Sequence, residues 1–325
     1  MNSSSPKRSS KSGMPAGSLI HIVEKKVEKK FVVAGIGELL WDIFKNEKKL
    51  GGAPANFAYH VSALGHNGII ISRIGNDELG REVIDFLEKL NLDTGLIQVD
   101  NQMPTGIVVV EMDENNQPDY IIKEEVAWDF LEWSEKINDL LASVDAVCFG
   151  TLAQRNGAAR KTILKFLKMV NNRAVKILDI NLRQSFYSGQ IIEESLKSAD
   201  ILKLNTGELE VLSSLFQINP KYSEKDLCRF LIDRYSLNLI CLTKGEEGSL
   251  ILNDNSYCES PAFPYEVVDR VGAGDAFTAA MIIQYLKGST LAEISEYANR
   301  LASWVTSNKG GTPVYDSAIK KIMNL

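Results

Sequence analysis

The sequence predicts an α/β protein in which helices cover both faces of a mostly parallel central sheet. Short apolar runs alternate with amphipathic helical patterns along most of the chain. These runs are apolar without interruption, which is typical of parallel strands that are buried on both faces. Two further stretches have a strand–turn–strand pattern without a helix, and they predict a small β-layer that stands apart from the main sheet.

The strands and helices of the main layer are predicted from their different hydrophobic spacing. The strands are short and continuously apolar, whereas the helices have apolar residues three or four positions apart. Strands are expected at 31–34, 69–72, 146–149, 175–180, 201–203, 239–242 and 249–252. Helices are expected at 54–64, 78–90, 157–171, 189–198, 206–216, 223–236 and 275–287.

The small β-layer is predicted from two hairpins, at about 39–51 and 104–125. The first turns at residues 45–47, and the second turns at the polar residues 113–116. We expect the two hairpins to form a lid over a ligand, and surface hairpins without function are the alternative. An exposed apolar face on such a lid would favour a homodimer.

Composition limits the class of protein. The chain has 325 residues, of which 45% are hydrophobic and 24% charged, as in ordinary globular proteins. The net charge of −6 argues against nucleic acid as a partner, and no apolar run is long enough to span a membrane. Residues 1–30 are predicted to be a disordered leader and lead-in without the apolar core of a secretory signal. The four separated cysteines favour reduced thiols and a cytoplasmic location.

The segment from Val267 to Phe277 is the strongest indication of chemistry. An apolar strand ends in Asp269, the sequence Gly272-Ala273-Gly274 follows, and Asp275 opens an apolar helix. Bare amides at a helix N-terminus favour a bound anion. A carboxylate beside that anion is costly unless it has a chemical task, so the segment predicts phosphoryl transfer. The same helix end should keep Asp275 ionised without a raised pKa. The alternative is an N-cap after a tight turn.

Two common nucleotide-binding motifs are missing from the sequence. Gly35-Ile36-Gly37 follows the first predicted strand, but Leu40 stands where a dinucleotide fingerprint needs its third glycine. No Gly-Lys-Ser or Gly-Lys-Thr sequence occurs, so a P-loop is excluded.

A second group of residues is suited to a ligand with neighbouring hydroxyls. Asp42 is an acid in an apolar setting, and Gly51-Gly52 precede a helix start that contains Asn56. Glycines allow a ligand to approach closely, and Asp and Asn side chains can bind hydroxyls. A turn acid and an ordinary helix cap are the alternatives for Asp42 and Asn56.

Polar residues also follow neighbouring strands of the predicted parallel sheet. Asp179 and Asn181 end one strand, and Asn205 and Glu208 follow the next. Oxygen ligands of this kind suit a Mg²⁺ ion that keeps several waters and binds phosphates. A capping box explains the spacing of Asn205 and Glu208 equally well.

Glycine-rich turns near the C-terminus complete the pattern. Thr243, Gly245 and Gly248 follow another strand and could contact a nucleotide through the backbone, although a plain turn explains them as well. Residues 308–313 end a helix and could offer carbonyl oxygens to a cation, or be a simple stop.

Together these elements, in this order, resemble the ribokinase-like, or PfkB-type, carbohydrate kinases from about residue 31 to residue 313. The resemblance implies a three-layer sandwich with a small β-sheet lid, and residues 31–325 would form one kinase domain. It further implies ATP as co-substrate, Mg²⁺ as cofactor and a sugar as phosphoryl acceptor. The Gly-Ala-Gly-Asp sequence, together with the acid that leads it, is the most specific point of similarity.

The resemblance also implies a role for each matching residue. Asp275 would be the catalytic base, and the amides of residues 272–275 would form an anion hole. Asp42, Gly51, Gly52 and Asn56 would bind the sugar, and Asn205 and Glu208 would organise Mg²⁺ through water. The nucleotide site would be lined by Lys203, Asn205, Thr243, Gly245, Gly248 and Asn299.

One departure concerns a monovalent cation, which many members of the family bind near the leading acid. Asp269 would be its ligand here, but Arg270 stands where the family usually has Thr. A requirement for K⁺ is therefore left open.

The acceptor is predicted less sharply than the reaction. Residues 119–129 and 150–155 are most similar to fructokinases, so fructose is the expected acceptor. Ribose, 2-keto-3-deoxygluconate and a nucleoside are alternatives. Arg155 would favour an acidic sugar unless it forms a loop ion pair. A catalytically silent relative that acts as a binding or scaffold protein is the alternative of another class.

Overall fold

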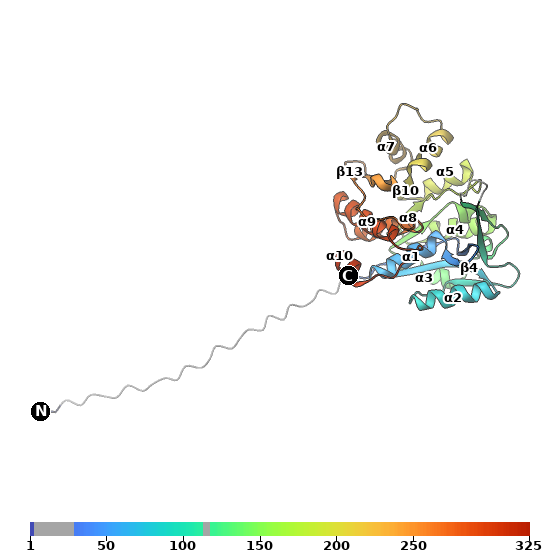
Figure 1. Cartoon of the computed structure of the whole chain (residues 1–325). Helices are drawn as coiled ribbons and strands as arrows, with labels where there is room; N and C mark the ends of the chain where they lie inside the picture. Colours follow the sequence, from blue (N-terminus) through green and yellow to red (C-terminus); the bar gives the residue numbers. More distant parts are fainter. Residues whose placement is uncertain (3–28, 113–117) are drawn as a thin grey trace.

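A nine-stranded, mostly parallel sheet is the centre of the structure (Figure 1). This computed structural model describes residues 1–2, 29–112 and 118–325. The strand order is β13-β12-β11-β10-β9-β8-β1-β4-β5. The strands that pair in parallel are β1 (Val32–Ile36), β4 (Asn67–Gly75), β5 (Ile97–Asp100), β8 (Ala146–Phe149), β9 (Val175–Asp179), β10 (Ile201–Asn205) and β11 (Leu239–Thr243). At one edge, β12 (Ser249–Leu252) and β13 (Tyr257–Ser260) are added antiparallel.

Both faces of this sheet are buried, because neighbouring residues of one strand enter different cores. Val33 and Ala34 are adjacent on β1, and each belongs to a separate hydrophobic cluster. The cluster around Val33 includes apolar residues of α1 (Ala53–Ala63), α2 (Glu78–Lys89), α8 (Ala273–Leu286), α9 (Leu291–Thr306) and α10 (Ser317–Ile322). The cluster around Ala34 includes those of α3 (Glu135–Leu140), α4 (Gly157–Met169), α5 (Gly189–Ser198), α6 (Thr206–Leu215) and α7 (Glu224–Tyr235). The predicted three-layer α/β sandwich is therefore confirmed.

The two predicted hairpins form a separate four-stranded sheet. β2 (Leu40–Ile43) pairs antiparallel with β3 (Lys48–Gly51), and β6 (Gly106–Met112) pairs antiparallel with β7 (Pro118–Ile122). β2 and β6 then join the hairpins in parallel. The predicted turn at 113–116 lies outside the described residues, as does most of the predicted leader, since residues 3–28 are not described.

Several short or amphipathic elements were not predicted. They include β5 and β13, which are half exposed, and the single-turn elements η1 (Ala127–Phe130), η2 (Leu152–Gln154) and η3 (Gly245–Glu247). α3 and α10 were also missed, because two helical turns are too short to show a clear apolar repeat. These elements lie at the periphery or in connections. α9 was also missing from the predicted helix ranges, and the strand expected to end at Asp269 is absent, because residues 261–270 form neither helix nor strand.

Arg155 follows β8 and forms a buried, bidentate ion pair with Asp129. Its Nε and Nη2 atoms each lie 2.8 Å from an Asp129 oxygen, and the two side chains are only 6% and 2% exposed. The guanidinium also stacks between the rings of Trp128 and Phe186, at 4.1 and 4.6 Å from their centroids. The loop ion pair considered for Arg155 is therefore what the structure shows.

The Arg155→Met variant should lower the free energy of unfolding by about 3–5 kcal/mol, because it leaves the Asp129 carboxylate buried without its partner. Urea unfolding measures this change. Arg160→Met is the matched control, since the ion pair of Arg160 with Glu194 is much more exposed and should contribute little to stability. Equal losses in the two variants would contradict the prediction.

Candidate active site

The first turn of α8 approaches the turn that follows α9 so closely that only glycine fits. Gly272 is the N-cap of α8 with φ of 77°, and a Cβ atom there would lie 2.4 Å from the Cα of Gly311. A side chain is excluded both by this contact and by the left-handed backbone. The predicted anion hole, residues 272–275, is therefore a tightly held helix N-terminus whose leading N–H groups lack helical acceptors.

Asp275 projects from this turn toward the N-terminus of α1. Asn56 on α1 donates a hydrogen bond of 2.8 Å from its Nδ2 to the Asp275 carboxylate. The Asp275 side chain also lines a small crevice with Glu38, Asp179 and Asn181, at the carboxyl ends of the strands. The structure therefore brings together the predicted base and one of the predicted sugar-binding residues. Asn56 thus links α1 to α8 through its side chain and is not the cap of its own helix, because the N-cap of α1 is Gly52.

The environment of Asp275 raises its pKa to about 7. Desolvation by the surrounding protein is the main cause, and the negative charge of Asp179 adds to it. The hydrogen bond from Asn56 and the charges of Lys203 and Arg183 act in the opposite direction. The expectation that the helix N-terminus leaves this pKa unraised was wrong, because burial outweighs the helix dipole.

A buried ion pair between two strands of the main sheet packs against the first turn of α8. Lys203 Nζ lies 3.0 Å from an Asp179 oxygen, and both side chains are less than 10% exposed. Thr278 on α8 donates to the other Asp179 oxygen at 3.0 Å. A Cβ atom on Gly274 would lie 2.9 Å from Lys203 Nζ, so the cation sits directly against the anion hole. Lys203 therefore supports the glycine turn, and it is not among the residues that line the larger cavity beside this turn, where the nucleotide was predicted to bind.

The small sheet provides the remaining predicted sugar-binding residues. Asp42 lies on β2, and Gly51 on β3 leaves room for it, because a Cβ atom there would lie 2.6 Å from an Asp42 oxygen. Gly52 then caps α1 with φ of 107°. Desolvation raises the pKa of Asp42 to about 6, against the charges of Arg183 and Lys49. Asp42 is thus a half-buried strand residue and not a turn acid.

Arg183 is a site residue to which the sequence analysis gave no role. Its positive charge acts against the raised pKa of Glu38, Asp42 and Asp275, so the guanidinium is near enough to influence all three carboxyls electrostatically. Arg183 is exposed and follows β9. The only sequence indication was its position four residues after Asp179, at the carboxyl end of a predicted strand.

A cavity of about 570 Å³ opens on the other side of the α8 N-terminus. The predicted nucleotide-site residues Asn205, Thr243, Gly245, Gly248 and Asn299 all line it, together with Ala273 and Gly274. Asn299 is buried and donates to Ser249 and Ser295, so it forms the floor of the cavity. The arrangement places a nucleotide-sized space and the crevice of Asp275 on either side of one glycine turn.

Asn205 and Glu208 form a complete capping box at the start of α6. Asn205 Oδ1 accepts from the Glu208 amide at 2.9 Å, and Glu208 accepts from the amides of Asn205 and Leu182 at 2.8 and 3.0 Å. Each of these oxygens thus already has one N–H donor. The pair fits Mg²⁺ only through bridging water, and the described residues contain no cluster of three acidic, His or Cys side chains suited to direct metal binding.

The Asp269 carboxylate accepts hydrogen bonds from three N–H donors, one of which is a cation. Its Oδ1 accepts from the Val271 amide at 3.1 Å, and its Oδ2 accepts from the Gly310 amide at 3.0 Å and from Lys49 Nζ at 3.1 Å. These contacts do not fit Asp269 as a direct ligand of a monovalent cation.

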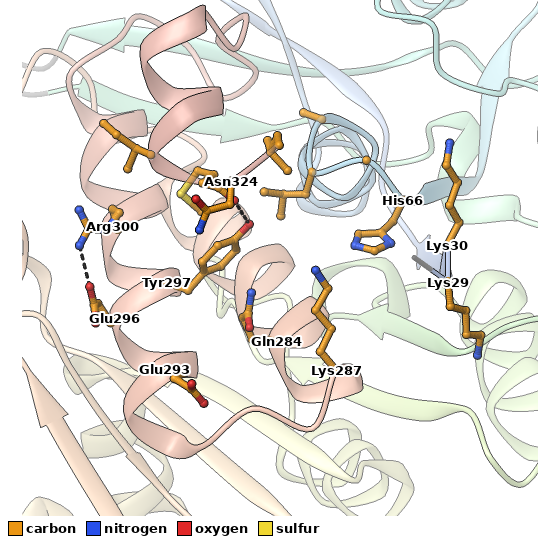
Figure 2. A pocket seen from close by; sticks show the side chains of 16 residues that line it. Lys29, Lys30, His66, Gln284, Lys287, Glu293, Glu296, Tyr297, Arg300 and Asn324 are labelled. Atoms are coloured by element: carbon orange, nitrogen blue, oxygen red, sulfur yellow. Dashed lines mark hydrogen bonds and ion pairs between the residues drawn. The ribbon is translucent and has the colours of Figure 1, made fainter. Parts of the chain in front are cut away.

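A second cavity, of about 850 Å³, lies at the opposite ends of α1 and α8 (Figure 2). It is lined by Leu64 and His66 after α1 and by Lys287 after α8, whereas the residues discussed above lie where these helices begin. No predicted site residue reaches it, so its size does not make it the active site.

No helix in the described part of the chain is both long and apolar enough to cross a membrane.

The comparisons with known proteins agree with this geometry. A model of the pfkB family carbohydrate kinases matches residues 20–318. The uncharacterized sugar kinase PH1459 of Pyrococcus horikoshii is 31% identical over 310 residues, which cover 89% of this chain and 95% of the relative. Its crystal structure, also determined in complex with ATP, superposes with a TM-score of 0.74 over 86% of this chain and 93% of its own.

Two fructokinases are more distant relatives. Fructokinase-1 of Zea mays is 26% identical over 282 residues, covering 82% of this chain and 85% of the enzyme. The structure of a Vibrio cholerae fructokinase double mutant, with fructose, ADP and potassium ion bound, has a TM-score of 0.76 at 22% identity and covers 90% of this chain and 98% of its own. From the family match, the site geometry and the fold, the chain belongs to the pfkB family of carbohydrate kinases.

Proposed function

We propose that this kinase transfers the γ-phosphate of ATP to a hydroxyl of a sugar, and that fructose is the preferred acceptor. The observation that carries the proposal is the position of Asp275. Asp275 lies in the first turn of α8, and its carboxylate accepts a hydrogen bond from Asn56 on the proposed sugar side. The preceding residue, Gly274, lines the nucleotide-sized cavity. A base between the two substrates is the arrangement that phosphoryl transfer to an alcohol requires.

In this proposal the sugar lies between the small sheet and α1. Asp42 and Asn56 bind its hydroxyls, and Gly51 and Gly52 allow the close approach. Asp275 accepts the proton of the attacking hydroxyl, and a pKa of about 7 suits a base that acts near neutral pH. The amides of residues 272–275 and the Lys203 charge behind Gly274 stabilise the negative charge of the transferred phosphoryl group.

ATP would occupy the cavity lined by Asn205, Thr243, Gly245, Gly248 and Asn299. Mg²⁺ would neutralise phosphate charge, with Asn205 and Glu208 binding its water ligands. The exposed Arg183 follows β9 and would be available to contact the sugar or the phosphoryl group. Closure of the small sheet would exclude water and so limit hydrolysis of ATP.

The preference for fructose is supported by the similarity to fructokinases over 82% of the chain. The ion pair of Arg155 with Asp129 weakens one argument for an acidic sugar, because the Nε and Nη2 atoms of this guanidinium are already bound to the Asp129 carboxylate. Ribose, 2-keto-3-deoxygluconate or a nucleoside remains as the alternative acceptor. A silent binding relative is disfavoured, because Asp275 and its hydrogen bond would then have no chemical use.

The Asp275→Asn variant should lose at least about 100-fold in kcat, because it removes the base that accepts the proton. Nucleotide affinity should change little, since the amide is nearly isosteric. ADP release measures the first effect and calorimetric titration with ATP the second. Asp233→Asn, an exposed carboxylate on α7, is the control and should behave like the wild type. A near-normal rate for Asp275→Asn would remove this residue from the mechanism.

The rate should rise with pH through a midpoint near 7, because only the deprotonated Asp275 can accept a proton. Below that midpoint kcat/KM should fall by about tenfold per pH unit, and above it the rate should level off. In Asn56→Ala the midpoint should move to higher pH, since the hydrogen bond that stabilises the carboxylate is lost. A rate that is flat between pH 6 and 8 would be incompatible with this assignment.

A coupled ADP-release assay with a panel of acceptors tests the substrate. We expect kcat/KM to be highest with fructose and lower with ribose, 2-keto-3-deoxygluconate and a nucleoside. A higher value with another acceptor replaces fructose by that compound. Turnover with none of them, while ATP still binds, points to the silent relative.

A further inference from the structure

Lys49 reaches from the small sheet to the loop that carries the anion hole. It lies on β3, directly opposite Asp42 of β2 in the strand register. Its ammonium is 3.1 Å from Asp269 Oδ2, and its side chain is only 23% exposed. The contact joins residues that are 220 positions apart, so the fold creates it.

We propose that the Lys49 ammonium takes the place of the monovalent cation at Asp269, and that this kinase therefore acts without potassium. The inference rests on the proposed kinase activity and adds a residue that positions its anion hole. Lys49 acts through Asp269 and is thus a positioning residue.

The contacts of Asp269 leave little capacity for a metal ion. Two backbone N–H groups and one ammonium share its two oxygens, and the two donors on Oδ2 are at 3.0 and 3.1 Å. A second cation beside Lys49 Nζ would be repelled, because two like charges at contact distance destabilise each other even near a protein surface. The built-in cation and a bound one thus exclude each other.

The same contacts connect the small sheet with the anion hole. Asp269 fixes the amide of Val271 on one side and that of Gly310 on the other. These two residues flank Gly272 and Gly311, whose backbones touch at the start of α8. Removing the charge on Lys49 should therefore loosen the turn that presents the amides to the phosphoryl group.

Two residues of its own hairpin also contact the Lys49 ammonium. It lies 5.2 Å from the centroid of the Phe44 ring and 3.8 Å from a Glu47 oxygen. Burial tends to raise the pKa of Asp269, but the Gly310 and Val271 amides and Lys49 outweigh it and lower that pKa. The carboxylate is therefore ionised at neutral pH and keeps its partner.

The test compares wild type, Lys49→Met and Lys48→Met at constant ionic strength, in potassium chloride and in tetramethylammonium chloride. Lys48→Met is a matched control, because Lys48 precedes Lys49 on the same strand but pairs with Glu82. Two quantities are measured, kcat/KM with the best acceptor and the melting temperature of the protein without substrates.

Wild type and Lys48→Met should have the same kcat/KM within about twofold and the same melting temperature in both salts. In tetramethylammonium, Lys49→Met should lose on the order of tenfold or more in kcat/KM, because a slightly misplaced site is costly. Potassium should restore part of that rate and raise the melting temperature of this variant alone by about 2 °C or more.

Three results would overturn the inference. They are activation of the wild type by potassium, a Lys49→Met rate equal to wild type in both salts, and a loss in Lys49→Met that potassium does not repair. If no acceptor is phosphorylated even by the wild type, the proposed activity fails. The potassium-dependent melting temperature of Lys49→Met then still decides the cation question.

Discussion

The close approach of the α8 N-terminus to the turn after α9 is the constraint on which the site depends. Gly272 can touch Gly311 only because neither residue has a side chain. The contact fixes the amides of the first turn of α8. It also holds Asp275 where its carboxylate accepts a hydrogen bond from Asn56 on α1. A larger residue at position 272 would displace the proposed anion hole and the proposed base together. Their relative position thus depends on one backbone contact.

Buried charge is the cost of this arrangement, and the surroundings compensate for most of it. Asp179 and Asp275 repel each other beneath the glycine turn, and Lys203 lies between the helix and the strand ends to offset them. The compensation is incomplete, so the pKa of Asp275 stays near 7. This imbalance gives a carboxyl group the proton affinity that a base needs at neutral pH.

The small sheet contributes charged side chains to the region around the start of α8. Asp42 and Lys49 face each other across the β2–β3 hairpin; Asp42 lies at the proposed sugar site, and Lys49 extends to Asp269. Any movement of this sheet would therefore change both the proposed acceptor site and the support of the proposed anion hole. Coupling of this kind would allow the turn to be fully ordered only when the sheet is in place.

The sequence by itself determined the layers, both hairpins and the order of the functional segments, because hydrophobic period and glycine placement are local properties. It also placed Asp275 at a helix start and the nucleotide-site glycines after strands. Tertiary structure alone decided the pKa of Asp275, the support role of Lys203, the electrostatic influence of Arg183 on three carboxyls and the pairing of Lys49 with Asp269. The capping box of Asn205 and Glu208 likewise needed coordinates to be distinguished from direct metal ligands. These properties depend on burial and on charges from residues distant in the chain, and no spacing along one segment can report either.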